Sequence, residues 1–580
     1  MRYSHYLLLL LFIASLAYAA APVRFAVIGD RTGGHTPGVY EEIILEIERL
    51  KPDFTMTVGD MIEGYTDDTT ELRRQWEEYL AIVAPLSAPI HYTPGNHDIT
   101  TGEDDGSVAQ VYRHFVEPPY HSFNYQNTHL IVLDNSRWDK SDDLPDEQIN
   151  WLIADLKKNR KAAFTMVFFH KPFWFETLAL GKRDRLHDIF REQGVDAVFT
   201  GHFHTYFSGE YDGILYTGIG SSSGATEPDV TGLMYHFGWI TVNEEGIHVA
   251  VIKKDSVLPW DQVTAEDLHL VSEMERSAIQ FAAPVRVGES GVIAGDKVVV
   301  RLLNPSGKQA VQDTLCWEVV DGWTATPPFL PVALGAGDSL SAEFTVSCDG
   351  SLFPSPVVGM RLPYREGRDG AMIRQPLPIQ RVVRCSRTGG ELNFDGVPDE
   401  TLWRQGEMKF FAPQGGVSQT DPETFFFAWN DSALLLAAVC EEIQPDKIAA
   451  TVKERDGAVY GEDCAGFFLC PPGPGEQQFV FQLYINPEGV VFDQRITVVN
   501  DQVTALEREW NGEYEIKTAR GERYWSFEAL IPLSQLNASA RAGDEWRVNF
   551  RRKQKRLNTS ADWQIPIGYE PAKYGLMILQ

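Results

Sequence analysis

The first half of the chain alternates short apolar runs with amphipathic stretches. Between residues 22 and 275, apolar runs end in Gly, Asp or His, as in VRFAVIG, DFTMTVG, FTMVFFH and DAVFTGH. Continuous apolar runs of this length predict strands that are buried on both faces of a sheet. The segments between them space apolar residues three or four positions apart, as at Val39, Ile43, Ile47 and Leu50, which predicts helices. The pattern therefore predicts a layered α/β domain over residues 22–275.

The pattern changes near residue 280. Residues 281–382 contain short alternating segments such as KVVVRLLN and SAEFTVSC, separated by Gly and Pro turns, and no helical period intervenes. Residues 385–580 continue in the same way with many aromatic residues, as in TFFFAWNDSALLLAAV. Period-two alternation with regular turn residues predicts β-sandwiches. We therefore expect a multidomain chain in which two all-β sandwiches follow the α/β domain.

The N-terminus carries a different signal. An apolar block from Leu7 to Ala14 follows Arg2, and Ala17-Tyr18-Ala19 has the small-residue pattern of a cleavage site. These features predict a signal peptide over residues 1–19. A membrane anchor is the alternative, but the block is shorter than the ~20 residues that a span needs. We expect an exported protein, periplasmic, cell-surface or extracellular, with no membrane span in the mature chain.

Charge and cysteine content narrow the picture further. The net charge of −30 is spread along the chain and argues against a nucleic-acid partner, since phosphate backbones require Lys and Arg. All six cysteines follow residue 315, and an even set in an exported protein predicts disulfides. Cys316 with Cys348 is the favoured pair, because both lie in neighbouring strand-like runs. Four more cysteines lie within residues 385–580, at positions 385, 440, 464 and 470.

Polar residues with nitrogen or oxygen donors follow the strands predicted in the α/β domain. Carboxyl ends of parallel strands meet at one sheet edge, where sites form. The residues at these ends are Asp30, Asp60, Asn96, His97, Asp98, His170, His202 and His204. Any one of them alone is more typical of a turn or a core residue, but the ordered set predicts a metal site.

This order resembles the calcineurin-like metallophosphoesterases, whose pattern is D-x-H, G-D, G-N-H-D/E, a lone H and G-H-x-H. The resemblance covers residues 24–250, and GNHD with GHFH are its most specific parts. It implies an αββα four-layer sandwich and two divalent metal ions, Mn, Fe or Zn, that activate water for attack on a phosphate ester. Carried across, Asp60 bridges both metals. The first metal is held by Asp30 and His204, the second by Asn96, His170 and His202.

The resemblance also suggests catalytic and substrate residues. His97 is the expected general acid for the leaving group, or a donor to the phosphate, and Asp98 is expected to orient its ring. Thr32 stands where the family pattern has a histidine, so a weaker oxygen donor or water would replace that ligand. Arg31 is a candidate contact to substrate phosphate, and His35 is a candidate to reach the site across Gly33-Gly34.

The last two regions resemble binding and spacer modules. Residues 390–580 are similar to family-nine carbohydrate-binding modules, in NFDGVPDETLW and WSFEALIPLSQL above all. Sugar rings stack on exposed aromatic residues, and Trp429 and Trp403 are the candidates for this role. Core packing is the alternative for both. Residues 281–382, with DGWTATPP, resemble the immunoglobulin-like spacers of secreted hydrolases.

We interpret the chain as an exported metal-dependent phosphoesterase that acts on phosphomonoesters or phosphodiesters and whose last module binds carbohydrate. The alternative is a carbohydrate-binding exported protein whose front domain binds metal without turnover. The nearly complete donor set favours the enzyme, because a degenerate site would be expected to lose several donors rather than one. A glycosidase is disfavoured, since no carboxylate pair indicates one.

Overall fold

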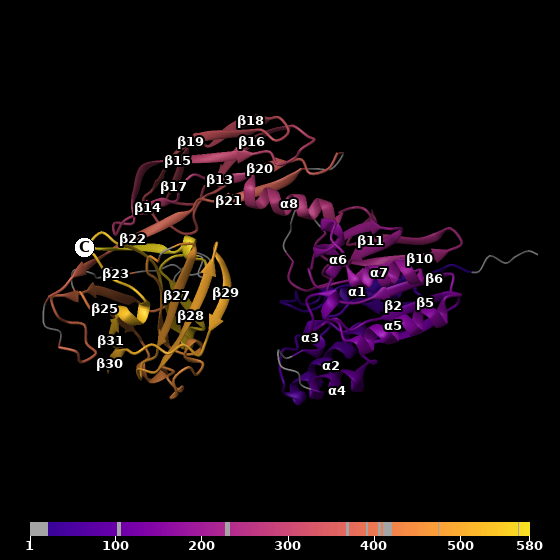
Figure 1. Cartoon of the computed structure of the whole chain (residues 1–580), viewed down its shortest axis with the longest axis horizontal. Helices are drawn as coiled ribbons and strands as arrows, with labels where there is room; N and C mark the ends of the chain where they lie inside the picture. The colour runs from indigo at the N-terminus through magenta and orange to yellow at the C-terminus, as the bar shows by residue number, and fades with distance from the viewer. Residues whose placement is uncertain are drawn as a thin grey trace, which may run out of the picture. The chain divides into compact units, whose positions relative to one another are not determined.

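The computed structural model describes residues 21–100, 106–226, 233–366, 370–389, 393–403, 408–409, 420–473, 475–565 and 568–580 (Figure 1). The expected signal peptide, residues 1–19, lies outside the described residues. No described helix is long and apolar enough to cross a membrane. The chain divides into two compact units: residues 1–272 with 364–370, and residues 273–363 with 371–580.

Two six-stranded sheets form the centre of the first unit. The first sheet has the order β12 (Ser256–Pro259), β11 (Gly246–Lys253), β10 (His236–Asn243), β1 (Val23–Ile28), β2 (Phe54–Thr57), β3 (Ile90–His91). The second has the order β4 (His121–Tyr125), β5 (Thr128–Val132), β6 (Phe164–Phe168), β7 (Ala197–Thr200), β9 (Ile214–Gly218), β8 (Phe207–Tyr211). In each sheet the strands nearest the site run parallel, as β1 with β2 and β6 with β7.

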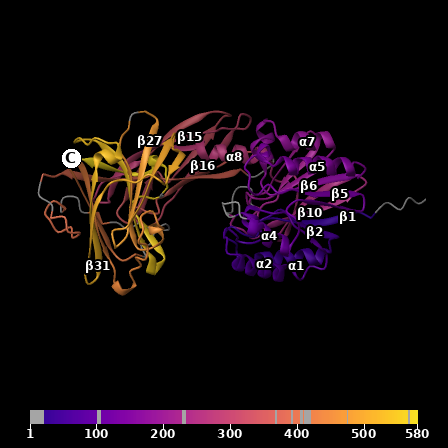
Figure 2. The same ribbon diagram turned by 60° about the horizontal axis from the view of Figure 1, so that its bottom comes forward.

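Helices cover the outer faces of both sheets (Figure 2). The first sheet is covered by α1 (Val39–Leu50), α2 (Thr69–Val83) and α4 (Gly106–Phe115), and the second by α5 (Asp146–Asn159) and α7 (Arg185–Gln193). A third apolar cluster lies between the sheets, where Phe25 stacks on Phe54 at 4.6 Å and meets Phe168 edge-on. Three separate cores of this kind define the αββα four-layer sandwich that the family resemblance implied. The remaining helices are α3 (Asn96–Ile99), α6 (Phe173–Glu176) and α8 (Ala265–Ser277), with 3-10 turns η1 (Ser141–Asp143) and η2 (Leu178–Leu180).

The turn after β2 is held by a single buried carboxylate. Asp98 accepts hydrogen bonds from the backbone N–H groups of Asp60, Met61 and Ile62 at 2.8, 2.8 and 3.2 Å, and from that of Gly95 at 2.9 Å. Asp60 itself adopts a left-handed backbone with φ of 62°. Gly95 passes so close that a Cβ there would lie 2.1 Å from Asp60 Oδ1 and 2.3 Å from its backbone nitrogen. The turn thus requires both the carboxylate and the glycine.

The second unit is built of strands. One pair of four-stranded sheets has the orders β13 (Ile279–Phe281), β15 (Ile293–Leu303), β19 (Ser339–Cys348), β17 (Trp323–Thr326), and β18 (Phe329–Leu334), β16 (Val311–Glu318), β20 (Val357–Leu362), β21 (Ala371–Pro376). β22 (Ile379–Arg387) belongs to the larger sheet that follows, and it pairs with β14 (Val285–Val287). Strand pairing therefore continues across residues 382–385, where the sequence suggested a boundary.

The larger sheet has fourteen strands in the described residues and folds around one aromatic core. Its order is β29 (Gln502–Glu507), β28 (Val491–Val499), β27 (Gln477–Ile485), β26 (Cys464–Cys470), β32 (Glu545–Gln554), β34 (Gly575–Leu579), β22, β24 (Glu423–Trp429), β25 (Ala433–Glu441), β31 (Tyr524–Pro532), β30 (Glu515–Arg520). β33 (Thr559–Asp562) pairs with β32, and β23 (Met408–Lys409) with β24. The three sheets of the second unit, two of four strands and one of fourteen in the described residues, agree with the predicted all-β class.

All six cysteines are free, which contradicts the predicted disulfides. Cys316 is exposed on β16, whereas Cys348 is buried on β19, and these strands belong to different sheets. An even number of cysteines indicates pairing only when their side chains face one another, and that depends on the sheet to which each strand belongs. The other four are buried, as small apolar side chains commonly are.

We predict that the native protein exposes one reactive thiol and the unfolded protein six. Cys316 is the exposed cysteine, and the other five are buried and free. Titration with a thiol reagent under non-reducing conditions, before and after denaturation, measures both numbers. Fewer than six thiols in the denatured chain would show that a disulfide forms.

We also predict that Gly95→Ala destabilises the first unit by at least about 2 kcal/mol, because the added methyl group overlaps Asp60. Gly106→Ala is the matched control: a Cβ there meets nothing within 4 Å, so its effect should stay within about 0.5 kcal/mol. Denaturant unfolding of both variants gives the comparison. Equal stabilities would mean that the turn tolerates a side chain at position 95.

Candidate metal centre

The predicted donors gather where the carboxyl ends of the two sheets meet. Asp30 and Asp60 follow β1 and β2 of the first sheet, and Asn96 opens the short helix α3 after β3. His170 follows β6 of the second sheet, and His202 and His204 follow β7. Each sheet therefore supplies part of the set, which explains how residues up to 174 positions apart in the sequence meet at one place.

The first group of donors consists of Asp60, His170 and His202. His170 Nε2 lies 3.2 Å from Asp60 Oδ2, 3.2 Å from His202 Nδ1 and 2.9 Å from Asn96 Oδ1. The other ring nitrogen of His170 contacts the Val58 carbonyl at 2.7 Å and so carries the proton. Asn96 thus contacts this group, and its role as a metal ligand stays a prediction.

The second group consists of Asp30, Asp60 and His204. His204 Nε2 lies 3.4 Å from Asp30 Oδ2, and its Nδ1 contacts the Ala225 carbonyl at 2.7 Å. The His202 N–H donates to Asp30 Oδ2 at 2.9 Å, whereas Asp30 Oδ1 is buried and has no hydrogen-bond partner among the described residues. Asp60 is the residue that the two groups share.

The charges in this centre shift one another strongly. Burial acts to lower the pKa of His170, but the charge and hydrogen bond of Asp60 outweigh it and raise that pKa to about 9. Burial likewise acts to raise the pKa of Asp60, and His170 lowers it to about 2. Burial and the charge on His170 lower the pKa of His202 to about 3. Burial raises the pKa of Asp30. The ionised carboxylates of Asp30 and Asp60 are therefore stable in this buried site only with positive charge beside them.

The donor set fits divalent metal ions. In a neutral ring, His170 Nε2 would turn a lone pair toward two acceptor oxygens, those of Asp60 and Asn96, since Nδ1 already holds the proton. Only a cation relieves this contact, and a metal does so as well as a proton. Asp30 Oδ1, which is buried without a hydrogen-bond partner among the described residues, would likewise be stabilised by a bound cation. Carboxylate, imidazole and amide oxygen are ligands of Zn, Mn and Fe.

His97 lies beside the centre, but Asp98 does not orient its ring, which corrects the sequence-based expectation. The His97 N–H donates to Asp60 Oδ1 at 2.9 Å, and its ring Nδ1 contacts the Glu63 carbonyl at 2.7 Å. The carboxylate of Asp98 is used by the backbone N–H groups of the Asp60 turn. Asp98 is therefore a positioning residue for Asp60, and Glu63 orients the ring of His97.

Thr32 braces the same turn. Its hydroxyl lies 3.0 Å from the Asp60 carbonyl and 2.8 Å from the Ile62 carbonyl, and its backbone N–H donates to the Asp60 carbonyl at 3.1 Å. The side chain is fully buried. Its hydroxyl proton is thus engaged with backbone oxygens of the turn that carries the shared carboxylate.

Arg31 does not face the site, contrary to expectation. Its side chain is 6% exposed, and its guanidinium donates to the Met61 carbonyl at 2.9 Å and to Glu78 at 3.3 Å. Through its bond to Met61, Arg31 stabilises the loop after β2. His35 is half-exposed and pairs with Glu63 at 2.8 Å. It belongs to neither group of donors, and its contact with substrate stays a prediction.

Two residues at the centre were missed by the sequence reasoning. The Tyr65 ring meets that of His97 edge-on at 4.5 Å, and its hydroxyl accepts a hydrogen bond from Asn96 Nδ2 at 2.6 Å. Asn135 Oδ1 accepts from the backbone N–H groups of His170 and Lys171, both at 3.0 Å. Asn135 directly follows the apolar run HLIVLD, so its place at a strand end was a usable signal. No sequence pattern pointed to Tyr65.

The two tryptophans proposed for sugar stacking are buried. Trp403 and Trp429 are 1% and 2% exposed, and their indole N–H groups donate to Glu528 and to the Gln580 carbonyl. A buried ring has no free face for a sugar, so both are core residues. The alternation of β24 turns Trp429 into the apolar core between the layers.

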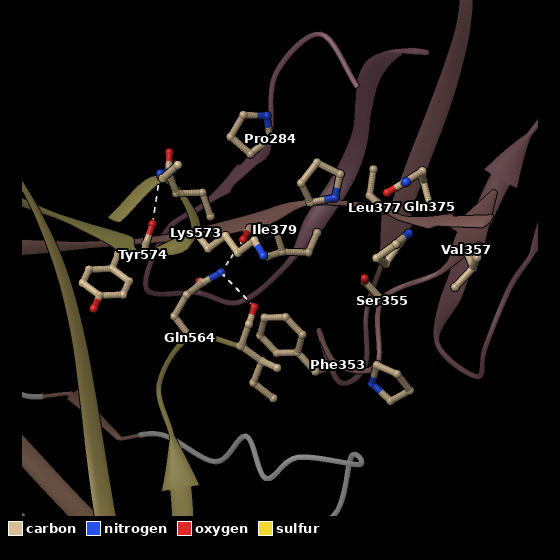
Figure 3. A pocket seen from close by; sticks show the side chains of 16 residues that line it. Pro284, Phe353, Ser355, Val357, Gln375, Leu377, Ile379, Gln564, Lys573 and Tyr574 are labelled. Atoms are coloured by element: carbon tan, nitrogen blue, oxygen red, sulfur yellow. Dashed lines mark hydrogen bonds between the residues drawn. The ribbon is translucent and has the colours of Figure 1, made fainter. Parts of the chain in front are cut away.

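The described part of the second unit contains an apolar and a polar hollow. The one in Figure 3, of about 480 Å³, is lined mainly by apolar side chains such as Phe353, Leu377 and Ile379, and the Gln564 amide near it donates to the Ile379 carbonyl at 2.5 Å. The other, of about 330 Å³, is polar and lies over β26, β27, β28, β32 and β33. It is lined by Tyr460, Gln482, Tyr484, Phe492, Gln494, Arg508, Arg551, Lys553, Ser560 and Tyr569.

Two solved structures that resemble parts of this chain have low sequence identity and low TM-scores. A family-nine carbohydrate-binding module from Caldicellulosiruptor kristjanssonii in complex with cellotriose is 16% identical with a TM-score of 0.24, covering 34% of this chain and 93% of that one. A dimetal phosphatase from Danio rerio is 13% identical with a TM-score of 0.30, covering 41% of this chain and 99% of that one.

Sequence comparison concerns the first unit. Residues 23–206 match the family described as Calcineurin-like phosphoesterase. Purple acid phosphatase 18 of Arabidopsis thaliana is 27% identical over 217 residues, and the human serine/threonine-protein phosphatase CPPED1 is 27% identical over 210. Each match covers 32% of this chain, which spans 45% and 65% of the length of those relatives. Residues 23–206 form a calcineurin-like phosphoesterase domain.

Proposed function

We propose that the first unit hydrolyses phosphomonoesters or phosphodiesters with the help of two divalent metal ions. The observation that carries this proposal is the shared carboxylate. Asp60 lies in a group with His170 and His202 and in a second group with Asp30 and His204. Two metal ions held about 3.5–4 Å apart by a common ligand are suited to stabilise both the attacking and the leaving oxygen of an in-line displacement.

The residues divide the work between them. Asp60, Asn96, His170 and His202 would hold one ion, and Asp30, Asp60 and His204 the other; such ions supply Lewis-acid activation of water and neutralise phosphoryl charge. His97 keeps a proton on Nδ1 against the Glu63 carbonyl, so that Nε2 is its exchangeable position. As an imidazolium it donates the Nε2 proton to the leaving oxygen, or a hydrogen bond to the phosphate.

Export of the protein belongs to the proposal as well. It is supported by the apolar block from Leu7 to Ala14 and by the Ala17-Tyr18-Ala19 pattern that follows. An exported phosphoesterase would meet phosphate esters outside the cytoplasm. The competing function, metal binding without turnover, has less support, since Thr32 is the single departure from the ligand pattern.

We further propose that the polar hollow of the second unit binds a glycan, in place of the buried tryptophans. Tyr460 is 51% exposed at its rim and meets Phe492 edge-on at 5.1 Å, so about half of this aromatic side chain is accessible to a sugar. Gln494 Nε2 bonds Gln482 and the Tyr569 hydroxyl, whereas the buried Gln494 Oε1 has no partner among the described residues. Amide, hydroxyl and aromatic groups around one hollow are what sugar hydroxyls and ring faces require.

We predict that Asp60→Asn lowers the rate of p-nitrophenyl phosphate or bis(p-nitrophenyl) phosphate hydrolysis at least about 1,000-fold, or about 4 kcal/mol in transition-state stabilisation. Asp143→Asn, an exposed change of the same kind, should leave the rate unchanged. Circular dichroism checks that both variants fold. A folded Asp60→Asn protein with a near-normal rate would contradict the two-metal proposal, and a metal-loaded wild type without turnover would support the non-catalytic alternative.

We predict that Tyr460→Ala weakens glycan binding by the full-length protein at least tenfold, because stacking on the ring is lost, while Tyr460→Phe retains it. Ile443→Ala, an exposed change outside the hollow, is the control. Calorimetric titration with simple sugars and soluble polysaccharides gives the affinities. No heat with any glycan in the wild type would remove carbohydrate from the function.

A further inference from the structure

A second group of metal-type donors lies away from the centre, in the same unit. His91 ends β3, His121 begins β4, and Glu117 lies between α4 and β4. β3 and β4 are the edge strands of the two sheets, and the His91 ring stacks on Phe123 of β4 at 3.8 Å. The group therefore lies where the edges of the two sheets meet. It shares no residue with the Asp60 groups.

Glu117 stands between the two histidines. Its Oε1 lies 3.1 Å from His91 Nδ1, and its Oε2 lies 3.2 Å from His121 Nε2. The Tyr92 N–H donates to Oε2 at 3.0 Å and so fixes the carboxylate against the first sheet. A single side chain thus connects both edge strands.

One ring nitrogen of His121, Nε2, lacks a well-formed hydrogen bond among the described residues. Nδ1 contacts the Pro118 carbonyl at 3.0 Å, and because a carbonyl only accepts, Nδ1 carries the proton. In the neutral ring Nε2 then offers a lone pair to a carboxylate oxygen. Nε2 is buried and has no well-formed hydrogen bond within the described residues. A lone pair facing a carboxylate at 3.2 Å requires a cation between or beside them.

We propose that His91, Glu117 and His121 bind a zinc ion that fastens the edges of the two sheets together. Each histidine nitrogen lies 3.1 or 3.2 Å from one oxygen of Glu117, and one ligand atom from each of the three residues lies within 4.8 Å of the others. Ligand atoms at 2.0–2.1 Å from a tetrahedral zinc lie about 3.3–3.4 Å from one another, so small shifts of these side chains would complete the site. The Pro118 carbonyl and the Tyr92 N–H are outer partners of the kind that orient zinc ligands.

The surroundings leave room for a fourth ligand. The side chains of His91, Glu117 and His121 are 20%, 29% and 15% exposed, so water can reach the group. Two imidazoles and a carboxylate with water in the remaining position make a four-coordinate zinc. An ion that binds the folded chain and not the unfolded one stabilises the fold by mass action, and here it would stabilise the contact between the sheets.

The test uses the full-length protein, stripped of metal by chelation and dialysed against zinc sulfate. We expect Glu117→Gln to bind one zinc equivalent fewer than wild type and to lose at least about 4 °C of the zinc-dependent increase in Tm. The amide keeps an oxygen for the Tyr92 N–H, so the fold should be retained. His114→Gln, on the exposed side of α4, should bind as much zinc as wild type.

Zinc at the Asp60 groups is counted separately. The double variant Asp60→Asn, His202→Ala should still bind the zinc equivalent assigned to His91, Glu117 and His121. Adding Glu117→Gln to this double variant should remove that equivalent. If Glu117→Gln does not fold, His121→Gln replaces it in both comparisons. Equal zinc stoichiometry with and without the Glu117 or His121 change would overturn the proposal and leave the group an ion pair. Because the readouts are zinc content and Tm, the result does not depend on whether the protein hydrolyses phosphate esters.

Discussion

The burial of two carboxylates at one edge of the first unit is the constraint on which the rest of this domain depends. Asp30 and Asp60 are 0% and 2% exposed. Removing an ionised carboxylate from water costs several kcal/mol even after the protein relaxes, unless positive charge lies beside it. Apart from the backbone N–H groups of His97 and His202, the neighbouring partners are the rings of His170 and His204. The Nδ1 atom of each ring contacts a carbonyl, so its Nε2 satisfies a carboxylate only when it is protonated or shares a metal with it. The two sheets thus assemble an arrangement that is complete only when cations are bound.

Backbone strain adds to this cost and is concentrated at the same place. Asp60, His202 and His204 all have left-handed backbones, with φ of 62°, 78° and 56°. Each such residue costs about 1–3 kcal/mol, and it persists only when its surroundings fix it. The fixing groups are the Asp98 carboxylate below the Asp60 turn, the Asp30 oxygen that accepts the His202 N–H, and the Ala225 carbonyl that holds the ring of His204. These contacts connect strand ends from both sheets, so the site and the packing of the sheets stabilise each other.

The sequence indicated where the candidate donors lie but not where the residues that support them lie, for a physical reason. A donor at the end of an apolar run is placed by the strand itself, which is why Asp30, Asp60 and His170 could be assigned from pattern alone. Arg31, one residue after Asp30, turns to the opposite side and is buried against Met61 and Glu78, and no local pattern encodes that direction. The predictions that Trp429 stacks on a sugar and that Cys316 forms a disulfide were wrong for the same reason, because the burial of a side chain and the pairing of cysteines depend on which sheet a strand joins. Asp98 has the residue type of a ring-orienting group, yet its oxygens are taken by backbone N–H groups that only the folded turn brings together.

Thr32 shows how a departure from a ligand pattern is compatible with an intact centre. The family pattern places an imidazole there, and this chain has a hydroxyl that bonds the Asp60 and Ile62 carbonyls. In this chain the position holds the turn that carries the shared carboxylate. Asp30, Asp60 and His204 still converge, and three protein ligands with an open position are the arrangement that catalytic zinc sites use. An ion at Asp30, Asp60 and His204 would be held by one imidazole fewer than the family pattern provides, and one more coordination position would be open to water or a phosphoryl oxygen. Because the first group keeps Asn96, His170 and His202 and still shares Asp60, the two ions would differ in how firmly they are held rather than in whether they are held.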